Sequence, residues 1–288
     1  MGRFSPPITA VRAAVTRALE EDLVPLGDIS SALLPPEAVA DARFVTRGDG
    51  VLAGTDCATE AFAQLDPAIT CRWSAGDGDH VRAGDVLGTV EGPLAPVLTG
   101  ERTALNFLCH LSGIATLAQR FVEAAGPTIT VWDTRKTTPG LRALEKAAVR
   151  AGGAVNHRGN LSEWVMLKDN HLTVLGVADG VARARAAHPG KLVHIECDTV
   201  EKVQEALEAG ADALLLDNME PEDARRCVKL ADEHAAAVRR ARPLIELSGG
   251  ITLETVRRFA DLGADLVSSG AITNSAPVLD IGLDIEVG

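Results

Sequence analysis

The chain contains no tyrosine, and aromatic residues make up only 3% of its 288 positions. Chemistry that needs a phenolic acid or base is therefore excluded. No run of about 18 apolar residues is present, which excludes a transmembrane helix. The first residues show neither the long apolar core nor the cleavage site of a secretory signal. We therefore expect a cytoplasmic protein that does not associate with membranes.

Cysteine and lysine are also scarce in informative ways. The five cysteines are odd in number, widely spaced and without a CxxC pair, so we expect reduced thiols rather than disulfides or zinc ligands. Lysine is absent before Lys136. Residues 76–92 (GDGDHVRAGDVLGTVEG) have the turn pattern of lipoyl and biotin carriers, but such a carrier needs an attachment lysine. Only a β-rich segment with tight turns, residues 39–99, is therefore predicted there.

The charge is unevenly distributed. A formal net charge of −12 excludes non-specific nucleic-acid binding. From Arg135 to Lys168, however, seven Lys or Arg residues face only two acids, Glu145 and Glu163. This cationic segment indicates a pocket for a small polyanion. Within it, the helical spacing of Arg142, Lys146 and Arg150 favours a solvated helix face.

Hydrophobic periodicity predicts the order of elements. We expect a helix at 8–23, and helical structure from about residue 100, broken near Gly113. Apolar strands then alternate with helices, which indicates a parallel sheet closing into a barrel of about seven strands. Thr199 and Thr252 are expected N-caps, and Gly210 and Gly263 left-handed helix ends. The expected strands are 128–133, 154–157, 164–167, 192–196, 213–217, 244–247 and 265–268.

The carboxyl ends of these strands carry the residues best suited to chemistry. In a parallel barrel such ends meet at one mouth. Arginines there match carboxylate or phosphate groups, glycines expose backbone N–H groups to phosphate, and two carboxylates suit a divalent cation. In chain order the set is Arg135, Lys136, His157, Arg158, Lys168, Asp169, Glu196, Asp217, Ser248, Gly249, Gly250 and Gly270.

Several motifs together resemble the quinolinate phosphoribosyltransferase family, also called nicotinate-nucleotide pyrophosphorylase (carboxylating). They are DTRKTTPGLR (133–142), GGAVNHRGN (152–160), KDNH (168–171) and SGGI (248–251). GDIS, ERTALNFLCHLSGIAT and DNMEP support the match, which extends over essentially the whole chain. The resemblance implies phosphoribosyl transfer from phosphoribosyl pyrophosphate to quinolinate with Mg²⁺. The products would be nicotinate mononucleotide, pyrophosphate and CO₂, in NAD biosynthesis.

The resemblance also implies a type II phosphoribosyltransferase fold. We expect an N-terminal α/β sandwich domain over residues 1–115, to which the tail 275–288 returns. An open seven-stranded α/β barrel would occupy residues 116–274. A homodimer or higher oligomer with shared active sites is implied, because Arg102 matches an arginine that reaches the neighbouring subunit's site.

Site roles follow from the same resemblance. Lys136, Lys168, Glu196 and Asp217 are the expected catalytic residues. Glu196 and Asp217 are also the expected metal ligands, directly or through water or pyrophosphate. The expected substrate-binding residues are Arg102, Thr134, Arg135, Lys136, His157, Arg158, Lys168, Glu196, Asp217, Ser248, Gly249, Gly250, Gly270 and Ala271.

One departure and three alternatives stay open. The family usually has Thr-His-Ser where this chain has Thr273, Asn274 and Ser275, and asparagine cannot become cationic. A sister transferase that acts on another acid is therefore one alternative. A lyase that uses Lys168 as a Schiff base is the second, and a non-enzymatic anion binder the third. The tryptophans Trp73, Trp132 and Trp164 are expected only to pack.

Overall fold

The computed structural model describes residues 4–287 and divides into two compact units. Unit 1 comprises the described residues up to Gln119, then Thr137–Gly153, and those from Ile272 onward. Unit 2 comprises Arg120–Lys136 and Ala154–Ala271. Residues 137–153, which we expected in the barrel domain, thus lie in unit 1. Within the described residues, no helix is long and apolar enough to cross a membrane.

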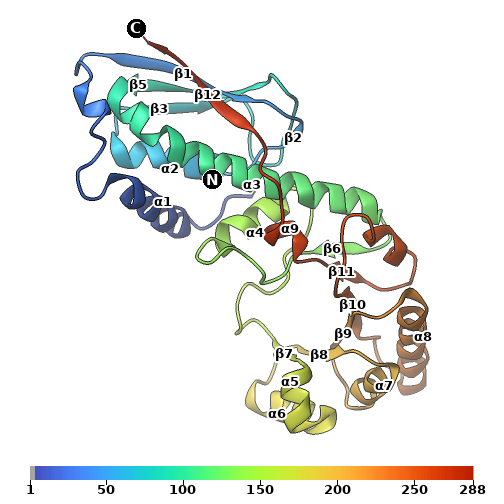
Figure 1. Cartoon of the computed structure of the whole chain (residues 1–288). Helices are drawn as coiled ribbons and strands as arrows, with labels where there is room; N and C mark the ends of the chain where they lie inside the picture. The colour runs from blue at the N-terminus through green and yellow to red at the C-terminus, as the bar shows by residue number, and fades with distance from the viewer. Residues whose placement is uncertain (1–3, 288) are drawn as a thin grey trace. The chain divides into compact units, whose positions relative to one another are not determined.

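Unit 1 is built on an antiparallel sheet of order β12-β1-β5-β3 (Figure 1). The C-terminal strand pairs with β1, so that Val287 faces Ala40 and Ile281 faces Thr46. The tail of the chain is therefore an edge strand of this sheet. The strands are β1 (Val39–Thr46), β3 (Thr70–Trp73), β5 (Val86–Pro93) and β12 (Ile281–Val287), with a separate pair β2 (Gly50–Val51) and β4 (His80–Val81).

Helices cover one side of this sheet. The predicted first helix is confirmed as α1 (Ile8–Leu23), whose apolar face buries Val11, Val15 and Leu19. A second helix, α2 (Thr55–Leu65), interrupts the segment that we predicted to be β-rich. Phe62 of α2 and Trp73 both pack against Phe44 of β1. A 3-10 turn, η1 (Ser31–Leu33), precedes β1.

The expected break near Gly113 is wrong, because α3 runs unbroken from Leu94 to Ala125. A Cβ atom at Gly113 would lie 2.1 Å from the carbonyl oxygen of Pro277. The glycine therefore permits the backbone of the returning tail to approach the helix closely, without ending it. Leu279 N also donates to Cys109 O of the same helix (3.0 Å).

The charged face expected to be solvated is only partly so, because Arg142 and Arg150 are half-buried and Lys146 between them is buried in unit 1. In α4 (Arg142–Ala151), Glu145 is fully buried and Lys146 is 6% exposed. Glu145 accepts hydrogen bonds from His110 Nε2 (2.9 Å) and Thr138 N (3.2 Å). Helical spacing of charges does not by itself say which side faces water, and here hydrogen bonds within the unit compensate the burial.

Unit 2 is a six-stranded parallel sheet of order β6-β11-β10-β9-β8-β7. The expected strand at residues 154–157 is reduced to a single parallel bridge between Val155 and Trp132, at the outer edge of β6. Within residues 4–287, no pairing joins Val155 to β7, so the seven-stranded barrel is open. The strands are β6 (Thr130–Trp132), β7 (Val165–Leu167), β8 (Val193–Cys197), β9 (Ala213–Asp217), β10 (Leu244–Ser248) and β11 (Leu266–Ser268).

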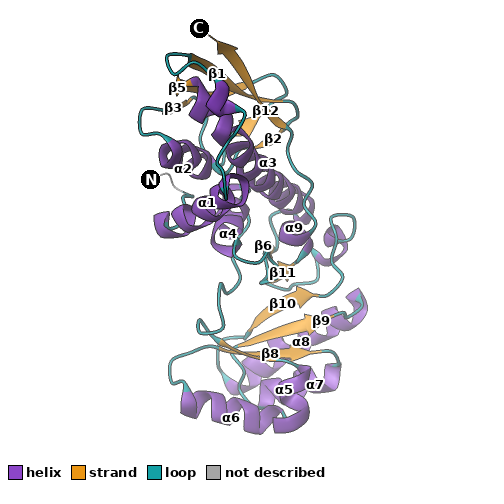
Figure 2. Ribbon diagram, turned by 60° about the vertical axis from the view of Figure 1, so that its left-hand side comes forward, coloured by secondary structure: helices purple, strands orange, loops and turns teal. Residues whose placement is uncertain are grey.

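Helices α5 to α8 lie on one side of the central strands (Figure 2). Gly210 (φ 77°) and Gly263 (φ 83°) have the expected left-handed conformation. The side chain of the aspartate two residues after each glycine accepts an N–H near the start of the neighbouring strand: Asp212 from Val193 N (2.7 Å), Asp265 from Ile245 N (2.8 Å). The repeated Gly-Ala-Asp thus anchors strands at their amino ends. The helices are α5 (Asp169–Leu175), α6 (Val177–Ala187), α7 (Val200–Glu208) and α8 (Pro221–Val238).

One of the two expected N-caps is confirmed. Thr199 accepts from Lys202 N (3.2 Å) at the start of α7. The helix expected after Thr252 is wrong, because only a 3-10 turn, η2 (Val256–Phe259), forms there. The Thr255 hydroxyl accepts from Thr252 N (2.9 Å), which draws the backbone into a local turn instead of an α-helix.

Candidate functional site at the carboxyl ends of the barrel strands

The candidate residues of unit 2 lie at or just beyond the carboxyl ends of its parallel strands. Thr134, Arg135 and Lys136 follow β6, and His157 and Arg158 follow the Val155 bridge. Each of the remaining strands contributes in the same way. Lys168 follows β7, Glu196 lies in β8, Asp217 ends β9, Ser248 ends β10 before Gly249 and Gly250, and Gly270 and Ala271 follow β11.

Arg102 is separate from this set. It is exposed on α3 and belongs to unit 1. Asn274, at the end of the short helix α9 (Ala271–Asn274), is also exposed in unit 1 and accepts from the Ser275 hydroxyl (2.6 Å).

Asp133 joins the two segments that carry the arginines. It is fully buried and accepts from His157 N (2.7 Å) and from the Asn156 side chain (2.8 Å). The segment after Val155 is therefore held against the segment after β6, although only one bridge pairs them. Asp133 is not among the site residues that the sequence predicts. Its signal is an acidic residue directly after an apolar strand.

Arg135 and Arg158 are close enough to affect each other electrostatically. Burial lowers the pKa of Arg158, and the positive charge of Arg135 lowers it further, while Glu163 and Glu246 oppose the shift. Arg158 is only 6% exposed. A buried guanidinium beside a second, half-buried one is costly unless an anion joins them. The pair therefore suits an anionic ligand.

Trp164 adds a further donor beside Arg158. Its ring lies 4.9 Å from the ring of His157 and 6.2 Å from that of Trp132, so the expected packing is confirmed. Arg158 Nη1 also contacts the Trp164 carbonyl oxygen (3.4 Å). Arg158 Nε and Trp164 Nε1 are both buried without a hydrogen-bond partner among residues 4–287. Such donors are rare in folded proteins and indicate where an acceptor is missing.

Glu196 and Asp217 form the acidic side of the site, and Lys168 pairs with the first of them. Lys168 Nζ makes an ion pair with Glu196, whose side chain is 13% exposed. Glu196 and Leu215 are register partners, so Asp217, two residues along β9, lies on the same face of the sheet as Leu215. Asp217 accepts from the neutral Asn218 amide (2.9 Å), which does not neutralise its charge. Carboxylates on neighbouring strand ends are oxygen ligands of the kind that Mg²⁺ takes.

The turn after β10 depends on its glycines. Gly249 has φ 90° and Gly250 φ 58°, and a Cβ atom at Gly249 would lie 2.4 Å from Asn218 Oδ1. Asn218 N donates to Ser248 O (3.0 Å), so the turns after β9 and β10 are held together. Because no α-helix follows, any anion bound here would meet the N–H groups of a tight turn, not a helix terminus.

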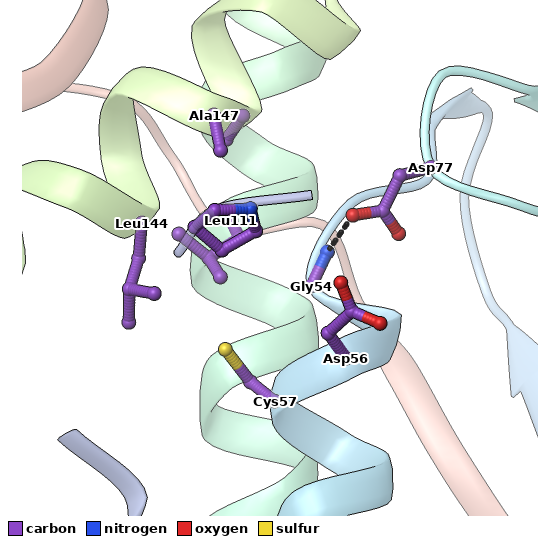
Figure 3. Close-up of a pocket in the computed structure, with 9 residues that line it drawn as sticks. Gly54, Asp56, Cys57, Asp77, Leu111, Leu144 and Ala147 are labelled. Atoms are coloured by element: carbon purple, nitrogen blue, oxygen red, sulfur yellow. Dashed lines mark hydrogen bonds between the residues drawn. The ribbon is translucent and has the colours of Figure 1, made fainter. Parts of the chain in front are cut away.

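A separate hollow lies in unit 1 and contains none of the candidate residues. Pro6, Gly54, Cys57, Leu111 and Leu144 are among its lining residues (Figure 3). At its side Asp77 accepts from Gly54 N (3.0 Å) and from the Thr55 backbone and hydroxyl. Burial raises the pKa of Asp77, and these hydrogen bonds oppose the shift. Asp77 thus caps the start of α2, which is a structural role.

The open parallel barrel and its cationic strand ends are those of a barrel protein that binds small anions. The family model "Quinolinate phosphoribosyl transferase, N-terminal domain" matches residues 28–112, and the corresponding C-terminal domain model matches residues 114–284. The chain belongs to the quinolinate phosphoribosyl transferase family.

Relatives agree over nearly the full length. A probable nicotinate-nucleotide pyrophosphorylase (carboxylating) of Bacillus subtilis is 40% identical, over 91% of this chain and 89% of the relative. A quinolinate phosphoribosyltransferase (decarboxylating) of Nicotiana tabacum is 36% identical, over 97% and 83%. The solved nicotinate-nucleotide pyrophosphorylase of Francisella tularensis superposes with a TM-score of 0.90, at 33% identity over 98% of both chains.

Proposed function

We propose that the chain transfers the phosphoribosyl group of phosphoribosyl pyrophosphate to quinolinate with decarboxylation. The products are nicotinate mononucleotide, pyrophosphate and CO₂, which makes the chain a nicotinate-nucleotide diphosphorylase (carboxylating), a pentosyltransferase of NAD biosynthesis. The observation that carries the proposal is the buried Arg158 beside Arg135, with donors that lack an acceptor. Family membership and the names of the relatives support the same reaction.

Charge explains why such a site is needed. Quinolinate has two adjacent carboxylates, and its partner carries several phosphate charges. Their mutual repulsion grows as water is removed, unless cations are already in place. In the proposal Arg135, Arg158 and Lys168 bind the dicarboxylate. Thr134 and Lys136 bind the phosphates and leaving group, and the Ser248–Gly250 turn with Gly270 and Ala271 binds the 5-phosphate.

The chemistry requires positioning and charge more than proton transfer. The pyridine nitrogen is itself the nucleophile, so no activated serine or cysteine is needed. As the bond to pyrophosphate breaks, positive charge develops at the ribose C1, and the carboxylates of Glu196 and Asp217 stabilise it. Once the ring nitrogen is cationic, it stabilises the carbanion left when the adjacent carboxylate departs as CO₂. This carbanion takes up a proton from water, which gives nicotinate mononucleotide. Holding the two reactants in register supplies much of the remaining acceleration.

We also propose that Mg²⁺ binds with the pyrophosphate at Asp217 and Glu196. Asp217 suits a metal ligand because its hydrogen-bond partner is a neutral amide. Glu196 already forms an ion pair with Lys168, so its negative charge is shared between that lysine and the ion. Mg²⁺ takes one or two protein carboxylates and completes its shell with phosphate oxygens and water. The ion would neutralise charge on the leaving group.

A cytoplasmic homodimer with shared sites completes the proposal. Arg102 is exposed on unit 1, as expected of a residue offered to a neighbouring subunit. Apolar side chains between α1 and β1 are also exposed by 67–85%, which favours burial by a partner. They are Val24, Leu26, Ile29 and Leu33. All five cysteines are free thiols, which suits a reducing compartment.

A product assay tests the reaction. The purified chain is incubated with phosphoribosyl pyrophosphate, Mg²⁺ and one of three acids: quinolinate, nicotinate or another pyridine dicarboxylate. We expect nicotinate mononucleotide and CO₂ in equal amounts from quinolinate only. Turnover of a different acid would instead favour the sister transferase. That alternative is motivated by Asn274, which stands where the family usually has histidine. Binding without turnover would favour the anion binder.

The Schiff-base alternative has its own test. Lys168 pairs with a carboxylate, whereas a Schiff-base lysine needs a neutral, desolvated amine. Borohydride treatment with carbonyl compounds should therefore leave the mass of Lys168 peptides unchanged. A trapped adduct on Lys168 would favour the lyase.

A further inference from the structure

A buried acid lies between the two halves of the candidate site. Glu246 of β10 is 1% exposed. Its Oε1 accepts from the Ser268 hydroxyl (2.5 Å), and its Oε2 lies 3.2 Å from His157 Nε2. The Ser268 hydroxyl also contacts the Ser248 hydroxyl (3.0 Å). Glu246 is thus connected to the residue before Arg158 on one side and to the glycine turn on the other.

The proton positions in this chain of contacts can be assigned. Arg158 N donates to His157 Nδ1 (2.9 Å), so Nδ1 is an acceptor and the neutral ring carries its proton on Nε2. That proton is donated to Glu246. A carboxylate has no proton to give, so Ser268 must donate to Glu246, and the same Ser268 hydroxyl is also placed to donate to Ser248 (3.0 Å). His157 and Ser268 therefore both donate to Glu246.

The same assignment argues against a metal ion in this place. Ligand atoms of His157, His194 and Glu246 lie within 4.8 Å of one another and could hold one by distance alone. A metal would need the lone pair of His157 Nε2, but this nitrogen carries the proton. His194 lies 3.5 Å from Glu246 without a hydrogen bond between them. The His194 ring makes its hydrogen bond with the backbone of Leu214 instead.

We propose that Glu246 is a positioning residue for both substrates. Through His157 it fixes the main chain at Arg158, and through Ser268 it fixes Ser248 and the start of the glycine turn. Both ring nitrogens of His157 are then used within the protein, and Ser248 is held by its contact with Ser268. In this proposal His157, which the resemblance places among the quinolinate-binding residues, supports the site, while the Arg158 guanidinium and the turn's backbone meet the substrates. This inference rests on the proposed function.

Two substitutions of Glu246 separate hydrogen bonding from mere packing. In Glu246→Gln the amide oxygen still accepts from His157, and the amide nitrogen donates to Ser268, which turns to donate to Ser248. In Glu246→Leu both branches are lost. We expect the KM for quinolinate and for phosphoribosyl pyrophosphate to rise about tenfold or more in Glu246→Leu, and to stay within about threefold in Glu246→Gln. Equal KM values in wild type and a folded Glu246→Leu variant would overturn the proposal.

Two further variants provide controls. Ser268→Ala cuts only one branch, so the KM for phosphoribosyl pyrophosphate should rise while that for quinolinate stays unchanged. Asp265→Asn removes a carboxylate from the amino ends of the same strands, where it bonds Ile245 N and Arg242. It should lower the melting temperature without changing either KM. If Asp265→Asn raised both KM values as Glu246→Leu does, the effect would be general loosening of the barrel and the proposal would fail.

Imidazole ¹⁵N NMR of the protein without substrate tests the proton positions independently of activity. We expect the His157 signal of wild type and Glu246→Gln to be that of a neutral ring protonated on Nε2, and to change in Glu246→Leu. A doubly protonated ring, a proton on Nδ1, or bound metal in the wild type would overturn the proposal. If the wild type shows the expected signal but does not turn over quinolinate, the proposed function fails while the hydrogen-bond assignment stands.

Discussion

Arg158 is the residue on which quinolinate binding depends most directly. Its guanidinium is buried beside Arg135, so its charge is already desolvated before a ligand arrives. A carboxylate that binds there makes charge-assisted hydrogen bonds of the strong kind. Burial of a cation is tolerable in the free protein because Glu163 and Glu246 partly compensate it.

We expect Arg158→Ala to lower kcat/KM for quinolinate, mainly through a higher KM, because a charge-assisted contact is lost. The loss of transition-state stabilisation should be about 2–4 kcal/mol. Steady-state kinetics measure this. Arg183→Ala is a matched control, since Arg183 is an exposed arginine of unit 2 paired with Asp179. An Arg158 variant as active as that control would remove Arg158 from the site.

Residue roles differ in how well a sequence predicts them. Cations after strand ends are visible in the sequence because parallel strands bring their carboxyl ends together. Asp133 and Glu246 are not, since one acid beside or inside an apolar run does not reveal its partners. The hydrogen bonds that hold Glu246 come from β11 and from the residues after the Val155 bridge, far away in the sequence.

At the scale of elements, strand positions follow from the sequence more closely than helix limits do. Buried parallel strands are short apolar runs, and six of the seven expected runs are confirmed as strands. Gly113 and Thr252 were misread for different reasons. The glycine serves a tertiary contact with Pro277, and the threonine lies in a turn held by Thr255. Neither partner is evident from local sequence.

Gly113 gives a direct test of that interpretation. We expect Gly113→Ala to destabilise the protein by about 1–3 kcal/mol, because the new methyl group would meet backbone that cannot easily move. Urea unfolding measures the change. Gly180→Ala in α6 is the control, because its added methyl would meet the flexible end of Leu167. A stabilised Gly113 variant would mean that the returning tail does not pack against α3 as described.

The whole molecule should lose stability as the pH falls, through His194. Burial lowers the pKa of His194 to about 4 from 6.5, so the folded state holds the ring neutral. The contribution of the neutral His194 ring to the free energy of unfolding is fully present above pH 6.5 and is lost as the pH falls toward 4. For this group alone we expect a loss of about 2 kcal/mol between pH 7.5 and pH 5.

Urea unfolding of wild type and His194→Gln at both pH values isolates this effect. Trp132 and Trp164 lie in unit 2 and Trp73 in unit 1, so tryptophan fluorescence reports on both units, with two of the three tryptophans in the barrel. The difference in unfolding free energy between the two proteins should narrow at pH 5. A difference independent of pH would show that His194 is not buried as a neutral ring.

A shared site predicts complementation between inactive subunits. Arg102→Ala and Lys136→Ala should each be inactive alone. After mixing with subunit exchange, hybrid dimers would hold one complete site each, so activity should recover to about a quarter of the wild-type value. No recovery, with exchange verified by mass spectrometry, would contradict a site that draws Arg102 from the partner.

The crystal structure of the chain with bound quinolinate is the most direct test of a common anionic pocket. We expect the two carboxylates to contact Arg135, Arg158 and Lys168, with the ring nitrogen facing the side of Glu196 and Asp217. Quinolinate bound elsewhere, or held by only one of these cations while the others point away, would contradict the proposed site.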